Sequence, residues 1–146
     1  SAPQRRAQAA VALTSLRDAS FAGSVLERRL SSESDPHVRF ALARALLRMN
    51  AEVALPSLRR LARTSEAMPQ VQSAILLARR DEPAAAEVLL EVLESDASSL
   101  LRRTAARGLA REARKPFWVR SFLVDSDPMV RIFAAGGVLS ASNRAP

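Results

Sequence analysis

Two stretches of sequence decide the fold: residues 35–46 are Asp-Pro-His-Val-Arg-Phe-Ala-Leu-Ala-Arg-Ala-Leu, and residues 127–138 are Asp-Pro-Met-Val-Arg-Ile-Phe-Ala-Ala-Gly-Gly-Val. Asp suits the N-cap of an α-helix, where its carboxylate accepts hydrogen bonds from free amides. Pro suits the first helical turn, where no amide hydrogen is needed. Each stretch therefore predicts the beginning of a helix, and the likeness of the two predicts an internal repeat.

Weaker copies of the same pattern lie between and before these stretches, at residues 5–13, 71–78 and 101–109. The copy at Val71 lacks the Asp and the Arg, and the copy at Leu101 lacks the Pro. Equivalent positions are Arg5, Val38, Val71, Leu101 and Val130, at spacings of 33, 33, 30 and 29 residues. Small residues recur on one side of these helices and would let two helices approach closely: Ala41, Ala45, Ala105, Gly108, Ala134 and Gly137.

A second set of amphipathic stretches alternates with the first, at residues 21–30, 51–62, 82–93 and 116–124. Their apolar residues recur at the i, i+3, i+4 spacing that places them on one face of a helix. Short polar joints separate the helices, among them residues 49–50 and 80–81. The sequence therefore predicts an all-α fold of about nine helices.

A helix pair of about 30 residues that opens with Asp-Pro-x-Val-Arg resembles a HEAT repeat, most closely the short bacterial type also found in phycobilin lyase subunits. The resemblance covers almost the whole chain. It implies a right-handed α-solenoid of about four and a half helix hairpins, with residues 1–146 as a single domain. Because the chain begins at Ser1 and its last helix has no partner helix, we expect a fragment of a larger protein in which Phe133, Val138 and Leu139 stay partly uncovered.

The composition agrees with an all-helical fold and excludes several kinds of site. The 146 residues include 28 Ala, 20 Leu and 21 Arg, which are strong helix formers, but only four Gly and no Tyr. The lack of Cys excludes disulfides, zinc knuckles and thiol nucleophiles. No apolar run approaches the roughly 20 residues that a membrane-spanning helix needs. We expect a cytoplasmic protein.

No catalytic or metal-binding pattern is visible in the sequence. His37 is the only histidine, and we expect it to be exposed at the start of a helix. Asp125 and Asp127 precede a helix and are interpreted as caps rather than metal ligands. There is no nucleophile elbow and no glycine-rich phosphate loop. We therefore predict a protein that is not an enzyme, with no cofactor, no metal and no evident small-molecule substrate.

The resemblance implies a structural role for the arginines that recur in the first set. In HEAT arrays the matching Arg forms a ladder with the Asp of a neighbouring repeat. The residues expected to form this ladder are Asp35, Arg39, Asp96, Arg102, Asp127 and Arg131.

The resemblance also places the second set of helices on the concave surface, which we predict to bind a protein partner. The exposed stripe at residues 56–63 is basic, whereas the stripe at residues 87–94 is acidic. Because a nucleic-acid groove should be uniformly positive, this mixture favours a protein partner. The residues predicted for this surface are Arg28, Arg59, Arg60, Arg63, Glu87, Glu91, Phe117 and Arg120, whereas Trp118 and Phe122 are expected in the core.

Two other functions stay open at this point. The formal net charge of +7 is compatible with nucleic-acid binding, as in HEAT-like alkylpurine DNA glycosylases. Its contacts would lie on the convex face, at Arg44, Arg48, Arg103, Arg107 and Arg111. The repeat type alone suggests the third function, a chromophore-lyase-like subunit.

Overall fold

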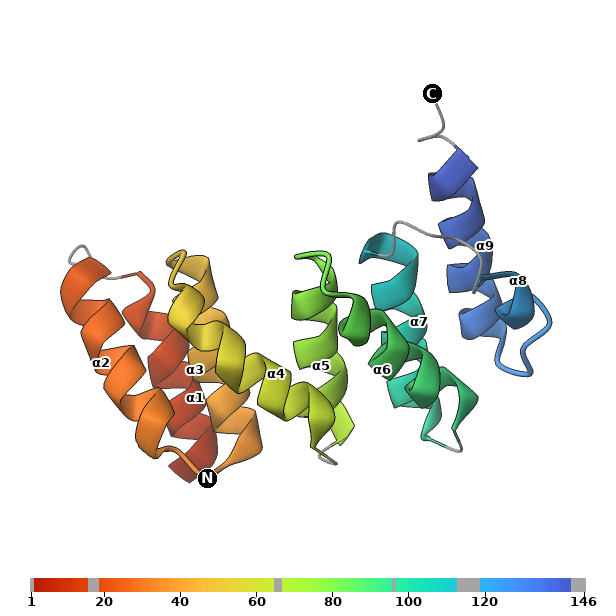
Figure 1. The fold of residues 1–146 in the computed structure, drawn as a ribbon. Coiled ribbons are helices and arrows are strands. Elements are labelled where there is room, and N and C mark those ends of the chain that lie inside the picture. The colour runs from red at the N-terminus through yellow and green to blue at the C-terminus, as the bar shows by residue number, and fades with distance from the viewer. Residues whose placement is uncertain (1, 16–18, 65–66, 96, 113–118, 143–146) are drawn as a thin grey trace. The chain divides into compact units, whose positions relative to one another are not determined.

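The computed structural model of the chain describes residues 2–15, 19–64, 67–95, 97–112 and 119–142. Across these ranges the secondary structure is helical and contains no strand (Figure 1). The prediction of an all-α fold is confirmed. The elements are α1 (Ala2–Leu13), α2 (Ala19–Ser32), α3 (Pro36–Arg48), the 3₁₀ turn η1 (Glu52–Ala54), α4 (Leu55–Arg63), α5 (Ala67–Ala78), α6 (Pro83–Glu94), α7 (Ser99–Glu112), α8 (Val119–Phe122) and α9 (Pro128–Ser142).

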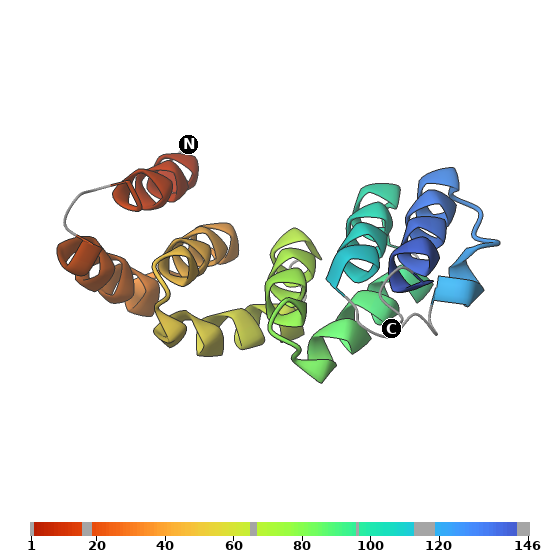
Figure 2. The ribbon, with the colours of Figure 1, turned by 90° about the horizontal axis from the view of Figure 1, so that it is seen from above.

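The chain divides into two compact units, Ser1–Ser73 and Ala74–Pro146, and the division falls inside α5. In the first unit, α1 and α3 lie side by side, and α2 and α4 pack against α3 (Figures 1 and 2). In the second unit, α7 and α9 lie side by side, with α6 against α7 and α8 against α9. Within each unit, helices of the two sets therefore alternate as the repeat predicts.

The predicted Asp-Pro helix starts are present in α3 and α9. Asp35 has an extended backbone, and its Oδ1 accepts a hydrogen bond from the amide of Val38 at 3.0 Å. Asp127 Oδ1 accepts a hydrogen bond from the amide of Met129 at 2.9 Å. Each carboxylate satisfies a donor that the first helical turn leaves free, so the local sequence alone is sufficient to start these helices.

The predicted polar joints at residues 49–50 and 80–81 are helix ends with a shared geometry. Asn50 and Asp81 both have φ of 59°, in the left-handed region. The next amide reaches back into the helix, from Ala51 to Leu46 O at 3.0 Å and from Glu82 to Leu77 O at 3.3 Å. This is the Schellman arrangement, in which Asn and Asp can stand where Gly is most common.

The core lies between the two sets of helices within each unit. The equivalent residues Val38 and Val130 are 1% and 0% exposed, and the second set contributes buried leucines, including Leu26, Leu58 and Leu89. Gly108 allows the predicted close approach, because a Cβ built there would lie 2.5 Å from Ile75 Cγ1. A larger residue at position 108 would require the side chain of Ile75 to move.

Two of the predicted second-set helices have different boundaries in the structure. The helix predicted over residues 51–62 begins as the 3₁₀ turn η1, and α4 starts at Leu55 because Pro56 has no amide to continue an earlier α-helix. The helix predicted over residues 116–124 ends at Phe122, where the amide of Asp125 closes a turn onto Phe122 O. Phe122 is buried as predicted, and Phe117 and Trp118 lie outside the described residues.

Candidate binding surfaces

Two ion pairs with one layout connect neighbouring helices of the first set. Arg6 of α1 makes two hydrogen bonds to Glu33, from Nε at 2.9 Å and from Nη2 at 3.1 Å. Arg102 of α7 pairs with Asp125 through Nη2, while its Nε donates to the carbonyl of Leu93. Glu33 and Asp125 each lie two residues before an N-cap aspartate and accept the amide of that aspartate. The chain thus contains a ladder in both units.

The pairing within this ladder differs from the prediction, which assigned the acids to Asp35, Asp96 and Asp127. Asp35 is used as the cap of its own helix, and Asp96 lies outside the described residues. Arg39 and Arg131 do not reach the neighbouring helix but donate to backbone carbonyls six residues earlier, at Glu33 and Asp125. Arg39 and Arg131 therefore stabilise the start of their own helices, and the acid two residues before the cap binds Arg6 or Arg102 of the neighbouring helix.

Asp127 has a second role, because it also binds Arg103 of α7. Arg103 Nε lies 2.8 Å from Asp127 Oδ2, and the carboxylate is 7% exposed. The hydrogen bond from Arg103 lowers the pKa of Asp127, and the hydrogen bond from Arg6 lowers the pKa of Glu33. Arg103 was expected to be a free cation on the convex face, but the structure uses it to hold α7 to α9.

The other arginines predicted for the convex face are exposed. Arg107 and Arg111 are exposed on α7. Arg44 and Arg48 of α3 border a hollow of about 300 Å³ whose other walls include Val11 and Phe40. None of these four arginines bonds to another part of the chain that the structure describes.

The charged residues predicted for a protein partner are also on the surface. The side chains of Arg28 on α2, of Glu87 and Glu91 on α6, and of the α4 residues Arg59, Arg60 and Arg63 are exposed. Phe117 lies outside the described residues, and only the backbone of Arg120 is described, in α8. In α4 and α6 one apolar side is buried, including Leu58 and Leu61 of α4 and Leu89 and Leu93 of α6, and the charged residues face outward as the amphipathic pattern predicts.

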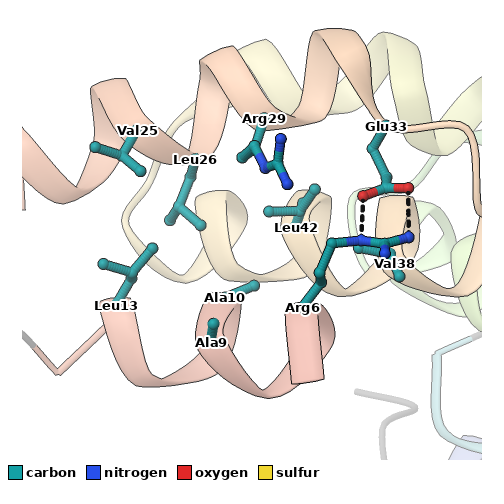
Figure 3. Close-up of a pocket in the computed structure, with 10 residues that line it drawn as sticks. All are labelled: Arg6, Ala9, Ala10, Leu13, Val25, Leu26, Arg29, Glu33, Val38 and Leu42. Atoms are coloured by element: carbon teal, nitrogen blue, oxygen red, sulfur yellow. Dashed lines mark hydrogen bonds and ion pairs between the residues drawn. The ribbon is translucent and has the colours of Figure 1, made fainter. Parts of the chain in front are cut away.

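A pocket that no sequence pattern indicated lies between α1, α2 and α3 (Figure 3). Its volume is about 240 Å³, and its walls are mostly apolar. The Arg6–Glu33 pair closes one end, and Arg29 of α2 projects over the middle (Figure 3). The pocket depends on how α1 sits against α2 and α3, which a pattern of single helices does not reveal.

An apolar stripe on α9 was anticipated only in part. Ile132, Ala135, Gly136 and Leu139 follow the i, i+3, i+4, i+7 spacing of one helix face and are all exposed. Ile132 is 59% exposed and Leu139 is 66% exposed, whereas Phe133 and Val138 are half-buried. We refer to these four residues as the α9 face. Leu139 was expected to be uncovered, but the equally exposed Ile132 was missed.

Neither a metal centre nor a membrane-spanning helix is found in the described parts of the chain. His37 is exposed, as predicted. No family model matches the chain, and no curated protein or solved structure matches it either.

Proposed function

We propose that the chain is a non-enzymatic scaffold of HEAT-like repeats that stack as a right-handed α-solenoid of about four and a half hairpins and bind protein partners. The alternation of helix sets within each unit, the repeated caps and the repeated ladder support this proposal. The observation that carries the proposal is the exposed α9 face, which we propose as the binding site for an amphipathic helix of a partner protein.

The equivalent face of α3 shows how such a surface is normally covered. Residues 92 positions earlier than Ile132, Ala135 and Leu139 are Phe40, Ala43 and Leu47. Phe40 is 9% exposed and Ala43 is 0% exposed, and η1 and α4 pack on α3. In α7 the matching residue, Ala106, is 1% exposed, and α9 packs on that helix. Part of this face is therefore buried in α3 and α7, although Arg44 and Arg107, which match Gly136, stay exposed.

The chemistry of the partner helix follows from the face and from the charge of the chain. The face offers branched side chains on both sides of Ala135 and Gly136, which would let a helix approach closely. A Cβ built at Gly136 meets no atom within 4 Å, so the surface is open there. The net charge of +7 favours a partner whose outer side is acidic. Helix α6 has this chemistry, with buried Leu89 and Leu93 and an outer side of glutamates.

A labelled peptide with the sequence of residues 81–95 tests the proposal by fluorescence anisotropy with the full chain. We expect saturable binding with a sub-millimolar Kd, because a free peptide of this length must fold as it binds. The double variant Ile132→Gln/Leu139→Gln should weaken binding by about tenfold or more, since it removes most of the apolar contact area. Both residues are exposed, so the fold should persist.

The matched control is Leu100→Gln/Val53→Gln, which removes exposed apolar side chains elsewhere, at 64% and 52% exposure. It should bind the peptide as the wild type does. A peptide with the same composition but a scrambled apolar pattern should not bind. The proposal fails if wild type and the α9 variant bind equally, or if the scrambled peptide binds as well.

Nucleic-acid binding is the second candidate, favoured by the four exposed arginines that have no bonded partner among the described residues, Arg44, Arg48, Arg107 and Arg111. Labelled duplex and single-stranded DNA at two salt concentrations test it, because phosphate contacts weaken steeply as salt rises. Salt-sensitive binding that is reduced in Arg107→Gln/Arg111→Gln would favour this function over the protein scaffold. If no DNA binds at low salt, nucleic-acid binding is excluded as the function.

A further inference from the structure

The pocket between α1, α2 and α3 combines an apolar slot with an arginine side chain that has no bonded partner among the described residues (Figure 3). Leu13 and Val25 stand at one end, Leu42 and Val38 line its inner side, and the Arg6–Glu33 pair stands at the other end. Ala9 and Ala10 of α1 leave the slot open, because their side chains are too short to reach α2. The slot lies wholly within the first unit.

The guanidinium of Arg29 is free to bind an anion that enters this slot. The side chain of Arg29 projects from α2 over the slot and makes no hydrogen bond or ion pair with the described residues. Glu33 is the carboxylate beside it, but its two oxygens already accept two bonds from Arg6 and the amides of Ser34 and Asp35. Arg6 therefore neutralises Glu33 and keeps it engaged, so Arg29 supplies the net positive charge of the slot.

The size of the slot limits the apolar part of a ligand. An apolar cavity of about 150 Å³ holds a six-carbon ring. The slot, at about 240 Å³, is about 1.6 times as large and would have room for up to about nine to ten carbons at the same density, so a body of about eight carbons fits. Ligand pockets commonly combine such apolar walls with a few polar groups that set orientation. Arg29 is that group here, and its planar fork matches a carboxylate.

We propose that this slot binds a small monocarboxylate whose apolar body is a single chain or ring of about eight carbons. The body lies between Leu13, Val25 and Leu42, and the carboxylate accepts hydrogen bonds from Arg29. The binding is independent of the α9 face, which lies in the other unit. It adds a small-molecule site to a chain whose sequence shows none.

Octanoate, at concentrations well below its micelle range, is the probe. Titration into the ¹⁵N-labelled full chain should shift amide signals in residues 6–13 and 25–42 and saturate. Octylammonium carries the opposite charge on an alkyl chain only one methylene longer and should not shift them. In Arg29→Gln the Kd for octanoate should rise at least about fivefold, as expected when a charge-assisted hydrogen bond is lost. The control Arg5→Gln, exposed on α1 and outside the lining of the slot, should leave the Kd unchanged.

A second pair of variants separates the slot from general apolar binding. Ala9→Leu places a larger side chain in the slot and should abolish octanoate binding, whereas Ala12→Leu, exposed on α1 outside the slot, should not. Circular dichroism would verify that both variants stay helical. The proposal is overturned if octanoate and octylammonium bind equally, if the shifts centre on Arg44 and Arg48 instead, or if no amide signal shifts.

Discussion

Glycine has opposite roles at two positions of this chain, although both lie inside helices. At Gly108 a side chain would meet Ile75, with a Cβ 2.5 Å from Cγ1 and 2.8 Å from Cδ1. At Gly136 a Cβ would meet no atom within 4 Å. The first glycine is therefore needed for helix packing, whereas the second only lowers the helix propensity of α9.

We predict that Gly136→Ala raises the free energy of unfolding by about 0.5–1 kcal/mol, the gain expected from helix propensity. Gly108→Ala should lower it despite the same gain, because the side chain of Ile75 must move. Urea unfolding followed by circular dichroism measures both changes. Adding Ile75→Ala to Gly108→Ala should relieve the clash, so the two substitutions would not be additive. Strict additivity would contradict the close approach.

The left-handed backbone at Asn50 leads to a second prediction at the scale of a residue. Both Asn50→Gly and Asn50→Ala remove the amide side chain, so they differ mainly in how easily they adopt a φ of 59°. Asn50→Gly should be more stable than Asn50→Ala by about 1 kcal/mol, the cost of a left-handed conformation for a residue with a Cβ. Equal urea midpoints for the two variants would show that the turn has another geometry.

At the scale of the element, the ion pairs Arg6–Glu33 and Arg103–Asp127 make the stability of the fold depend on pH. The pKa values of Glu33 and Asp127 are lowered in the folded chain, chiefly by hydrogen bonds from Arg6 and Arg103. As the pH falls, the unfolded chain takes up these protons first, so the stabilisation present at neutral pH is lost below about pH 5.

We predict that the wild type loses stability more steeply than Glu33→Gln/Asp127→Asn as the pH falls from 6 to about 3. The variant should be less stable at pH 7, and the two curves should converge in acid. Urea unfolding at each pH measures this, with Glu27→Gln on the exposed side of α2 as the control. Parallel curves for the wild type and the double variant would mean that the pairs do not stabilise the fold.

The elements also show how much the sequence could predict. Asp-Pro starts and polar joints act within a few residues, so the starts of α3 and α9 and the ends at Asn50 and Asp81 could be predicted. The partner of Arg102 could not be predicted, because Asp125 and Asp127 are two residues apart and only the packing of α7 on α9 decides which of them Arg102 binds. The slot beside Arg29 was missed for the same reason.

At the scale of the molecule, the exposed α9 face is the part of the proposal with the clearest consequence. The equivalent residues Phe40 and Ala43 of α3 and Ala106 of α7 are buried, whereas Ile132 and Ala135 of the α9 face are exposed. Burying its two large side chains would contribute a few kcal/mol to binding, since each buried Leu or Ile is worth about 1.5–3 kcal/mol. This is enough to hold a single helix weakly and reversibly.

The most direct test is a ¹H–¹⁵N correlation spectrum of the full chain titrated with the peptide of residues 81–95. We predict saturable shifts at residues 129–139 on α9, with the signals of α3 unchanged because Phe40 and Ala43 of its equivalent face are already buried. Shifts that centre on another helix, or a spectrum that does not change, would contradict the assignment of the α9 face to a partner helix.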